Sequence, residues 1–466
     1  MAGTTTSSNG YDSRSIDKND SVTTVLAEFV SNTTYDTLSP VVLEKLKELL
    51  LDIIGVASAA AAAAESSEPF LNAILDFGGP QSGTSTVFTK GHNFAPQYAA
   101  LLNAAFAHTY DFDDTLVKGG LHPGSSVVPA ALVQGETSGV DGKTLLTALA
   151  VGYEVACRIA VALGPGSYNR GFHNTGTAGI FGAVAAIGRA KNLPSNVIEN
   201  AFGLAGSKAA GSMSFMENGS WNKRLHPGFA DHDALLCIAL SEAGVIGSSK
   251  ALEGRTGFLH SYSDTSDTTG LTKNLGKDWI MMGTALKPYP ACRVTHASID
   301  LAAKMAKEYG GPVEKITVAL EPTGYTLVGL PVANKIRPEN IVDAQFSNYI
   351  QTAIAWLYGN ELGWSAYEKI FDKDAQELAM RIEHVVDSSL PACGTRMTVL
   401  WRDSTQREEY MAAPLGELSN PFVFEKVQRK YLSLATPVYG EDVSRRILDI
   451  VKHLEKYKVT ELMALL

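Results

Sequence analysis

Hydrophobic residues recur at helical spacing from the start of the chain to about residue 280. The stretch after Ser39-Pro40, VVLEKLKELLLDIIGVASAAAAAA, repeats apolar residues with the period of a helix, and a proline suits the first helical turn. Because such helices are apolar on most faces, we expect them to pack mainly against one another. Alanine-rich apolar stretches predict further helices over 98–108, 143–163, 177–191, 196–205 and 234–243.

The pattern changes near residue 310. Alternating segments rich in β-branched residues predict strands over 313–320, 380–387 and 397–402, beside helical stretches at 299–308 and 344–357. The helical period returns from residue 420 onward. We therefore predict a mainly α fold with two parts. A large all-α helical domain comprises residues 21–284 and 416–466, and a smaller α+β domain is inserted over residues 285–415.

The ends of the chain and its cysteines limit where the protein works. Residues 1–20 are polar and lack an apolar core segment, so we expect a flexible leader rather than a signal or transit peptide. No uninterrupted apolar run reaches the length of a membrane span. The four cysteines are widely spaced, which suits reduced thiols. We therefore expect a cytoplasmic protein that does not contact a membrane.

Composition narrows the possible partners. The chain has 466 residues, 39 Lys and Arg against 49 Asp and Glu, a net charge of −10, and 45% hydrophobic residues. This balance is typical of a globular protein rather than a disordered one. It also argues against nucleic acid as a partner, because nucleic-acid-binding domains usually carry a basic face.

Four histidines share one sequence context. His122, His173, His226 and His296 each precede or begin a predicted helix, and Thr295 is placed to cap the last of these helices. Free backbone N–H groups and the helix dipole favour an anion at such positions. Histidine also exchanges protons readily near neutral pH. Together these positions predict a site for a ligand that carries carboxylates.

Acidic and basic residues cluster beside these histidines. The run from Asp111 to Thr115, DFDDT, holds three carboxylates that can orient a histidine, act as a base or bind a divalent metal. Metal is the weakest of these interpretations, because no spaced partner ligands accompany the run. Lys223 and Arg224 are adjacent, so at most one of them should face a site, where it can anchor a carboxylate or stabilise an enolate. Two prolines stiffen the segment 287–296, as expected of a hinge or cleft wall.

These segments, taken in order, resemble the MmgE/PrpD family, which includes 2-methylcitrate dehydratases and cis-aconitate decarboxylases. The resemblance extends over nearly the whole chain from about residue 21 and implies a large all-α domain, a smaller α+β lid and a homodimer. The matching segments are YDFDDT (110–115), LHPGSSVVPAAL (121–132), GFHNTGTAGIFGA (171–183), GSWNKRLHPGFADH (219–232), LEGRTGF (252–258) and LKPYPACRVTHASID (286–300).

The resemblance also implies roles for individual residues. Arg224 and His226 lie beside the family's lysine position, and with Arg293 they are candidates for substrate binding. One departure follows the acidic motif, where many members place His, Trp or Tyr and this chain has Leu116, Val117 and Lys118. The residues that match the family's catalytic positions are Asp111, Thr115, His122, His173, Lys223 and His296.

The resemblance implies a lyase that acts on a small di- or tricarboxylate. Such an enzyme must handle a carbanion or enolate beside carboxylates, and we expect neither a metal nor an organic cofactor. Cations then hold the carboxylates, and poised acid and base groups move protons. Decarboxylation of cis-aconitate or a related acid is the leading hypothesis. Dehydration of 2-methylcitrate or another alkylcitrate, epimerisation of a dicarboxylate, and simple binding of a carboxylate are the alternatives.

Overall fold

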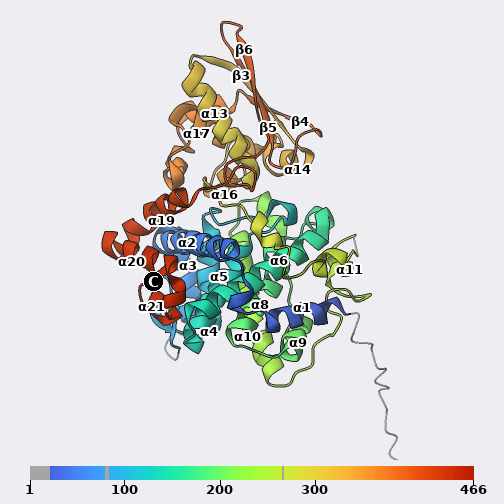
Figure 1. Cartoon of the computed structure of the whole chain (residues 1–466). Helices are drawn as coiled ribbons and strands as arrows, with labels where there is room; N and C mark the ends of the chain where they lie inside the picture. The colour runs from blue at the N-terminus through green and yellow to red at the C-terminus, as the bar shows by residue number, and fades with distance from the viewer. Residues whose placement is uncertain (1–20, 79–82, 265–266) are drawn as a thin grey trace, which may run out of the picture.

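The computed structural model describes residues 21–78, 83–264 and 267–466. The leader predicted for residues 1–20 lies outside the described residues. The predicted mainly α fold is confirmed: helices dominate, and the strands form one small sheet and one hairpin. Figure 1 shows a large body of helices with a smaller unit of helices and strands packed on one side of it.

Helices from both ends of the chain build the large body. The C-terminal helix α19 packs against α2, and α10 packs against α4 and α8. The helices of this body are α1 (Val22–Asn32), α2 (Pro40–Ala63), α3 (Ser67–Gly78), α4 (Pro96–Thr109), α5 (Pro123–Ser138), α6 (Gly142–Asn169), α7 (Asn174–Thr177), α8 (Gly179–Ala190), α9 (Ser195–Ala205), α10 (Asn222–Glu242), α11 (Phe258–Tyr262), α12 (Thr269–Thr272), α19 (Phe424–Tyr439), α20 (Glu441–Lys452) and α21 (Val459–Met463). A short hairpin of β1 (Ser85–Val87) and β2 (Gly91–Phe94) lies between α3 and α4.

The smaller unit is a four-stranded sheet with helices packed on it (Figure 1). Its strands are β3 (Val313–Leu320), β4 (Ile382–Val386), β5 (Thr395–Trp401) and β6 (Gln406–Met411), in the order β4-β3-β5-β6. Only the β3–β4 pair in this sheet is parallel; Val318 is opposite His384 on β4 and Met397 on β5. The helices of this unit are α13 (His296–Tyr309), α14 (Pro322–Gly324), α15 (Ala333–Ile336), α16 (Ile341–Gln345), α17 (Asn348–Tyr358) and α18 (Lys373–Ala379).

Burial in β5 follows the predicted alternation. Met397, Val399 and Trp401 are buried, and the residues between them are partly exposed. This period of two places one face of the strand against the helices and the other toward water. The sequence did not predict β6, because its residues QREEYM are mostly polar and exposed. An edge strand of this kind is held by its backbone hydrogen bonds to β5 rather than by an apolar face.

Buried apolar residues form two clusters. One draws on the helical body, from Leu26 to Leu286 and again from Val427 to Leu466. The other lies in the smaller unit, between Tyr289 and Trp401, and also includes Phe215 from the body. Aromatic pairs therefore join the two units, Phe215 with Phe346 and Tyr110 with Trp364. Phe215 stands in a 3₁₀ turn that precedes α10, close to the cavity described below.

Helix α6 is the single helix among the described residues that is long and apolar enough to pass a membrane-span test on its own. By length and composition it could cross a membrane, with a mean hydropathy of 1.6 over its most apolar window. That window is 89% buried inside the fold, and the helix packs against α5 and α8. The bent pair of α2 and α3 passes the same test together. Apolar faces of this extent are satisfied here by neighbouring helices, as in the core of a large helical domain.

The start of α10 also differs from the prediction. We expected a helix to open after His226-Pro227, but α10 begins at Asn222, so both residues lie inside it. Pro227 gives up one backbone hydrogen bond near the N-terminal end of the helix, where α10 is otherwise continuous. His226 is therefore not at a helix start, and a free-amide anion site at this position is ruled out. His122 and His173 do precede α5 and α7, and His296 begins α13.

Candidate active site

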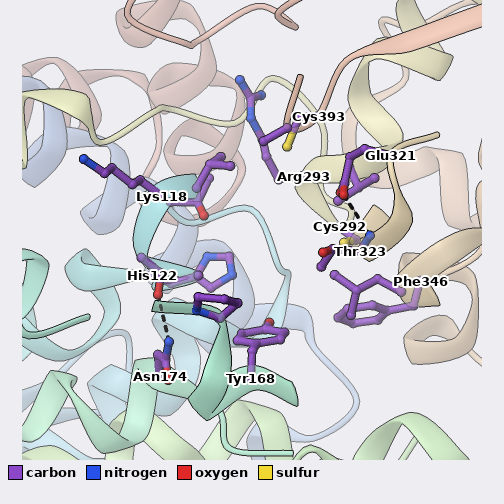
Figure 2. Close-up of a pocket in the computed structure, with 18 of the residues that line it drawn as sticks. Lys118, His122, Tyr168, Asn174, Cys292, Arg293, Glu321, Thr323, Phe346 and Cys393 are labelled. Atoms are coloured by element: carbon purple, nitrogen blue, oxygen red, sulfur yellow. Dashed lines mark hydrogen bonds between the residues drawn. The ribbon is translucent and has the colours of Figure 1, made fainter. Parts of the chain in front are cut away.

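A cavity of about 280 Å³ lies where the helical body meets the smaller unit. Its walls come from the loop after α4, the C-terminal end of α6, the start of α10 and several loops of the smaller unit. A concave site of this size, lined by apolar and charged groups, suits a small polar ligand. In Figure 2, Lys118, His122, Tyr168 and Asn174 lie on one side of the cavity, and Cys292, Glu321, Thr323 and Phe346 lie on the other.

A break in α6 shapes one wall. Gly164 has φ 57° and ψ −158°, which are not helical, and Pro165 follows it. Proline cannot continue the hydrogen-bond ladder, and glycine accepts the positive φ that redirects the chain. The last turns of α6 are thereby turned toward the cavity. Both residues line it, together with Tyr168 and Asn169.

Asp111 lies at the centre of the charged groups. Its Oδ1 accepts hydrogen bonds from Lys223 Nζ at 2.8 Å and from Lys287 Nζ at 2.9 Å. Lys287 Nζ also donates to the backbone carbonyl of Asp111 at 2.8 Å. Burial alone would raise the pKa of Asp111, but the two ammonium groups hold it well below its ordinary value. Its Oδ2 is buried without a hydrogen-bond partner among the described residues.

The backbone at Asp111 is strained. Its φ is 50°, in the left-handed region that side chains other than glycine rarely occupy. Strain of this kind persists only where surrounding contacts hold the residue, and it concentrates at functional sites. The turn follows directly on the end of α4 at Thr109 and brings the acidic motif under the start of α10.

A chain of hydrogen bonds orients Lys223. Asp113 Oδ2 lies 2.7 Å from His108 Nδ1, and His108 Nε2 lies 3.0 Å from Lys223 Nζ. Because the ammonium can only donate, His108 Nε2 must accept and its proton must lie on Nδ1, facing Asp113. Burial lowers the pKa of His108, which fits this neutral form. Lys223 is thus aimed by His108, and His108 by Asp113.

His122 lines the cavity, and its Nε2 has no hydrogen-bond partner among the described residues. It precedes α5, and its Nδ1 lies 2.8 Å from the backbone carbonyl of Asp114, so Nδ1 carries the proton. Nε2 is left to accept or return a proton. Burial and the ammonium of Lys287 lower the pKa of His122 well below its ordinary value. An anionic ligand beside it would raise that pKa again.

Both carboxylate oxygens of Asp114 bond to protein groups, one of them at the start of α5, so Asp114 is not available to bind a ligand. Its Oδ1 accepts a hydrogen bond from the Gly124 amide at 2.9 Å, and its Oδ2 accepts one from Tyr153 Oη at 2.7 Å. A Cβ atom at residue 124 would lie 2.6 Å from both Asp114 Oδ2 and Tyr153 Oη, so only glycine fits this approach. Burial raises the pKa of Asp114 to about 7.

His173 and His226 lie just behind the cavity. Their Nδ1 atoms are 2.9 Å apart, so one ring donates and the other accepts. The ring of His173 stacks on that of His108, with centroids 5.4 Å apart. Neither residue is among those that line the cavity. His173 therefore contacts His108, the residue that orients Lys223, and His226 contacts His173 on the side away from the cavity.

Arg224, His296 and Arg293 are held by other protein groups. Arg224 points away from Lys223, toward Ser66 and Glu65, as expected for adjacent residues on a helix. The Arg293 side chain lines the cavity, but its guanidinium donates to Glu417, to the Leu415 carbonyl and to His296 Nδ1. Because His296 Nδ1 accepts this bond, its Nε2 donates to the Ala291 carbonyl. Both ring nitrogens of His296 are occupied. The Thr295 hydroxyl bonds to the Cys292 carbonyl and does not cap α13.

The loop after the acidic motif lines the cavity, but not through its first residue. Leu116 is buried and lies next to Gly119 and Gly283. Val117, Lys118 and Gly119 line the cavity instead, in a 3₁₀ turn. Thr115 also lines it, and its backbone pairs with Ala285. Of the three residues that depart from the family's pattern, Val117 and Lys118 line the cavity and Leu116 does not.

His108, Asp113 and His122 form a compact group with the composition of a metal site. One potential ligand atom from each lies within 4.8 Å of the others. The sequence prediction had missed this grouping, because His108 stands outside the DFDDT run. The contacts fit a proton network better than a cation site. Asp113 is bonded to His108, and the ammonium groups of Lys223 and Lys287 stand close by, where they would repel a cation.

Two site residues escaped the sequence prediction: Lys287 and His108. Lys287 lies in the segment LKPYPACRVTHASID, where we singled out the histidine and arginine rather than the lysine. His108 lies inside the predicted helix 98–108, one turn before Asp111, where it looks like a core residue. No pairing signal connects Lys287 to Asp111 in one sequence, since they are 176 residues apart.

Comparisons with known proteins agree with this architecture. The family model of the MmgE/PrpD N-terminal domain matches residues 24–270, and that of the MmgE/PrpD C-terminal domain matches residues 289–456. The chain is 27% identical to a cis-aconitate decarboxylase-like protein, oryM, of Aspergillus oryzae, over 96% of this chain and 97% of the relative. It is 27% identical to a cis-aconitate decarboxylase of Aspergillus terreus over 96% of both chains, and 26% identical to one of Homo sapiens over 77% of both. Because the two family models cover most of its length, this chain belongs to the MmgE/PrpD family.

Proposed function

We propose that this chain is a lyase that decarboxylates cis-aconitate or a closely related unsaturated tricarboxylate. The observation that carries the proposal is the arrangement around Asp111, where two ammonium groups meet beside a neutral histidine that lines the cavity. The cis-aconitate decarboxylases among the relatives that match most of this chain support the same reaction.

The chemistry needs groups that the site holds. The bond to the departing carboxylate breaks, and its electron pair shifts through the neighbouring double bond onto carbon conjugated with a second carboxylate. Carbon dioxide leaves, and that carbon takes up one proton. Cations near the remaining carboxylates stabilise the negative charge that develops, and an acid supplies the proton.

Each role has a candidate residue. Lys223 lines the cavity and has a donor left after bonding to Asp111 and His108. Lys287 does not line the cavity, and its two bonds to Asp111 hold that residue in place beside Lys223. Nε2 of His122, protonated once an anionic substrate raises its pKa, is the proton donor. The Arg293 guanidinium is paired with Glu417, so we assign Arg293 a structural role in the cavity wall and no contact with a carboxylate.

The test is incubation of the purified protein with cis-aconitate in deuterated water, followed by NMR and mass spectrometry. Loss of carbon dioxide with one solvent deuteron on the new methylene carbon is the expected result. Parallel incubations with 2-methylcitrate and with a chiral dicarboxylate test the alternatives. Loss of water from the first would replace the proposal with a dehydratase. Deuterium uptake into the second without net mass loss would replace it with an epimerase, and binding without turnover would leave only a binder.

We also propose that the chain forms a homodimer, the state that the family resemblance implies. Helix α10 carries an exposed apolar strip of Phe229, Leu236 and Leu240, with exposed fractions of 52%, 44% and 37%. These residues are spaced to share one helix face. Exposed apolar residues gathered on one face of a helix favour an interface over a fully solvated helix.

A further inference from the structure

A lysine from the C-terminal tail reaches the acidic motif. Lys430 lies on α19, which packs against α2 in the helical body. Its side chain is buried, and its Nζ donates to the backbone carbonyl of Phe112 at 2.7 Å. The same atom lies 3.8 Å from the centroid of the Phe112 ring. The tail therefore contacts the residue between Asp111 and Asp113.

A buried ammonium needs a counter-charge, and α2 supplies it. Asp52 Oδ1 lies 2.7 Å from Lys430 Nζ, and the Asp52 side chain is fully buried. Taking two charges out of water costs so much free energy that a buried pair is weak evidence of stabilisation. Well-packed apolar side chains would often hold α2 and α19 together equally well. An apolar replacement at residue 430 would, however, lose the hydrogen bond to the Phe112 carbonyl.

The hydrogen bond from Lys430 reaches the loop between its two functional carboxylates, Asp111 and Asp113. Asp111, one residue before Phe112, has the strained φ of 50° and holds both site lysines on one oxygen. Asp113, one residue after, fixes the proton of His108. Rotation of the Phe112 peptide would move both carboxylates at once. Charged groups that face Lys430 are Asp52 on α2, Asp113 in the loop and Lys287 at the junction of the two units.

We propose that Lys430 is a positioning residue, which acts through the Phe112 carbonyl to hold Asp111 and Asp113 in the geometry that aims Lys223 and His108. Asp52 is its counter-ion. Lys430 is not among the residues that line the cavity, so a direct contact with substrate is not part of the proposed role. The proposal rests on the proposed decarboxylase function for its kinetic readout, but not for its structural one.

The test compares Lys430→Met with Lys47→Met. Lys47 is also buried, on α2, and pairs with Glu455 from the tail, so it controls for loss of a buried lysine that ties the tail to α2. In the decarboxylation assay we expect Lys430→Met to lower kcat by about 100-fold with little change in KM, since a misplacement of about 1 Å costs this much. Lys47→Met should keep wild-type kcat, and Lys430→Arg should recover part of the lost activity. Equal kcat values for the two methionine variants, or a loss explained by the unfolded fraction, would overturn the proposal.

Amide hydrogen exchange gives a second readout that needs no substrate. Peptides covering residues 109–116 should exchange faster in Lys430→Met than in the wild type, and peptides from α8 and α9 should not change. If the methionine variant does not fold, Lys430→Gln and Asp52→Asn serve in its place, with the same expectation. Unchanged exchange at 109–116 in a folded variant would refute the positioning role. Faster exchange there would support it even if wild-type protein left cis-aconitate intact, in which case the proposed function alone would fail.

Discussion

Lys287 donates two hydrogen bonds to Asp111, one to its Oδ1 at 2.9 Å and one to its backbone carbonyl at 2.8 Å. The two residues are 176 positions apart, one in the strained loop after α4 and the other where the smaller unit begins. A single ammonium thus fixes both the carboxylate and the peptide that carries it. A contact between the two units of the fold therefore helps to build the site.

Loss of Lys287 should reduce catalysis strongly. In Lys287→Met the Asp111 carboxylate keeps only Lys223, and the strained Asp111 peptide loses the ammonium that holds it, so Lys223 and the local positive field are displaced. We expect kcat/KM to fall by at least about 100-fold, the usual effect of removing one electrostatic group from an active site. Steady-state kinetics on cis-aconitate measures it, with circular dichroism to verify the fold.

Lys277→Met is the matched control for this experiment, because Lys277 is exposed and lies outside the cavity. It should behave as wild type. Wild-type kcat/KM in folded Lys287→Met would remove Lys287 from the proposed mechanism.

The apolar strip on α10 predicts a homodimer. Light scattering coupled to size-exclusion chromatography should report twice the chain mass of 49.7 kDa. A charge in the middle of the strip, in Leu236→Lys, should shift the protein toward the monomer, because an unpaired charge is costly in an apolar interface. Val41→Lys, at an exposed apolar residue on α2, should leave the dimer intact. A monomeric wild type, or a dimer unaffected by Leu236→Lys, would contradict the prediction.

A buried histidine in the smaller unit should make its stability sensitive to acid. His384 on β4 accepts a hydrogen bond from Asn348, and burial lowers its pKa to about 3. Its pKa in the unfolded chain is near 6.5, so the unfolded state takes up a proton that the folded state refuses. The stability contributed by neutral His384 is therefore present above about pH 6.5 and declines as the pH falls toward 3.

Comparison with His384→Gln isolates this effect, since glutamine can also accept from Asn348 but does not titrate. Between about pH 6 and pH 4 the wild type should lose up to about 1.4 kcal/mol per pH unit more than the variant. Chemical denaturation at each pH, followed by near-ultraviolet circular dichroism, measures the difference. Parallel pH dependence in the two proteins would mean that His384 titrates normally.

The class of fold could be predicted from the sequence because its signals are local. The helical period over 41–64 and the alternation over 397–402 appear in consecutive residues, and the structure has α2 (Pro40–Ala63) and β5 (Thr395–Trp401) there. Local signals failed where context decides. The segment at His226 and Pro227 predicts the start of a helix, but α10 starts at Asn222. Lys223 in its first turn bonds to Asp111 of the acidic motif, a contact that no local pattern encodes.

The site was predicted less completely, for a physical reason. Histidines that precede helices could be found from the sequence, and His122 does line the cavity. Which cation faces the ligand is set by tertiary contacts that no local pattern encodes. Arg293 looked free in the sequence, but Glu417, which is 124 residues away, occupies its guanidinium. Lys287 looked like part of a hinge, but it is paired with Asp111.

The state of His122 predicts how the rate depends on pH. In the free protein, burial and Lys287 hold the pKa of His122 well below its ordinary value, so only a small fraction carries the proton that the reaction needs. That fraction falls tenfold per pH unit, and kcat/KM should fall with it between about pH 7 and pH 9, where all substrate carboxylates are ionised. A bound polyanion raises the pKa, so kcat should stay level to a higher pH than kcat/KM does. Initial rates at constant ionic strength measure both curves.

His232→Gln, which alters a half-buried histidine outside the cavity, should reproduce the wild-type curves of kcat and kcat/KM against pH. A value of kcat/KM that rises over this range would show that the required form of His122 is the neutral base, and the proton donor would have to be Lys223.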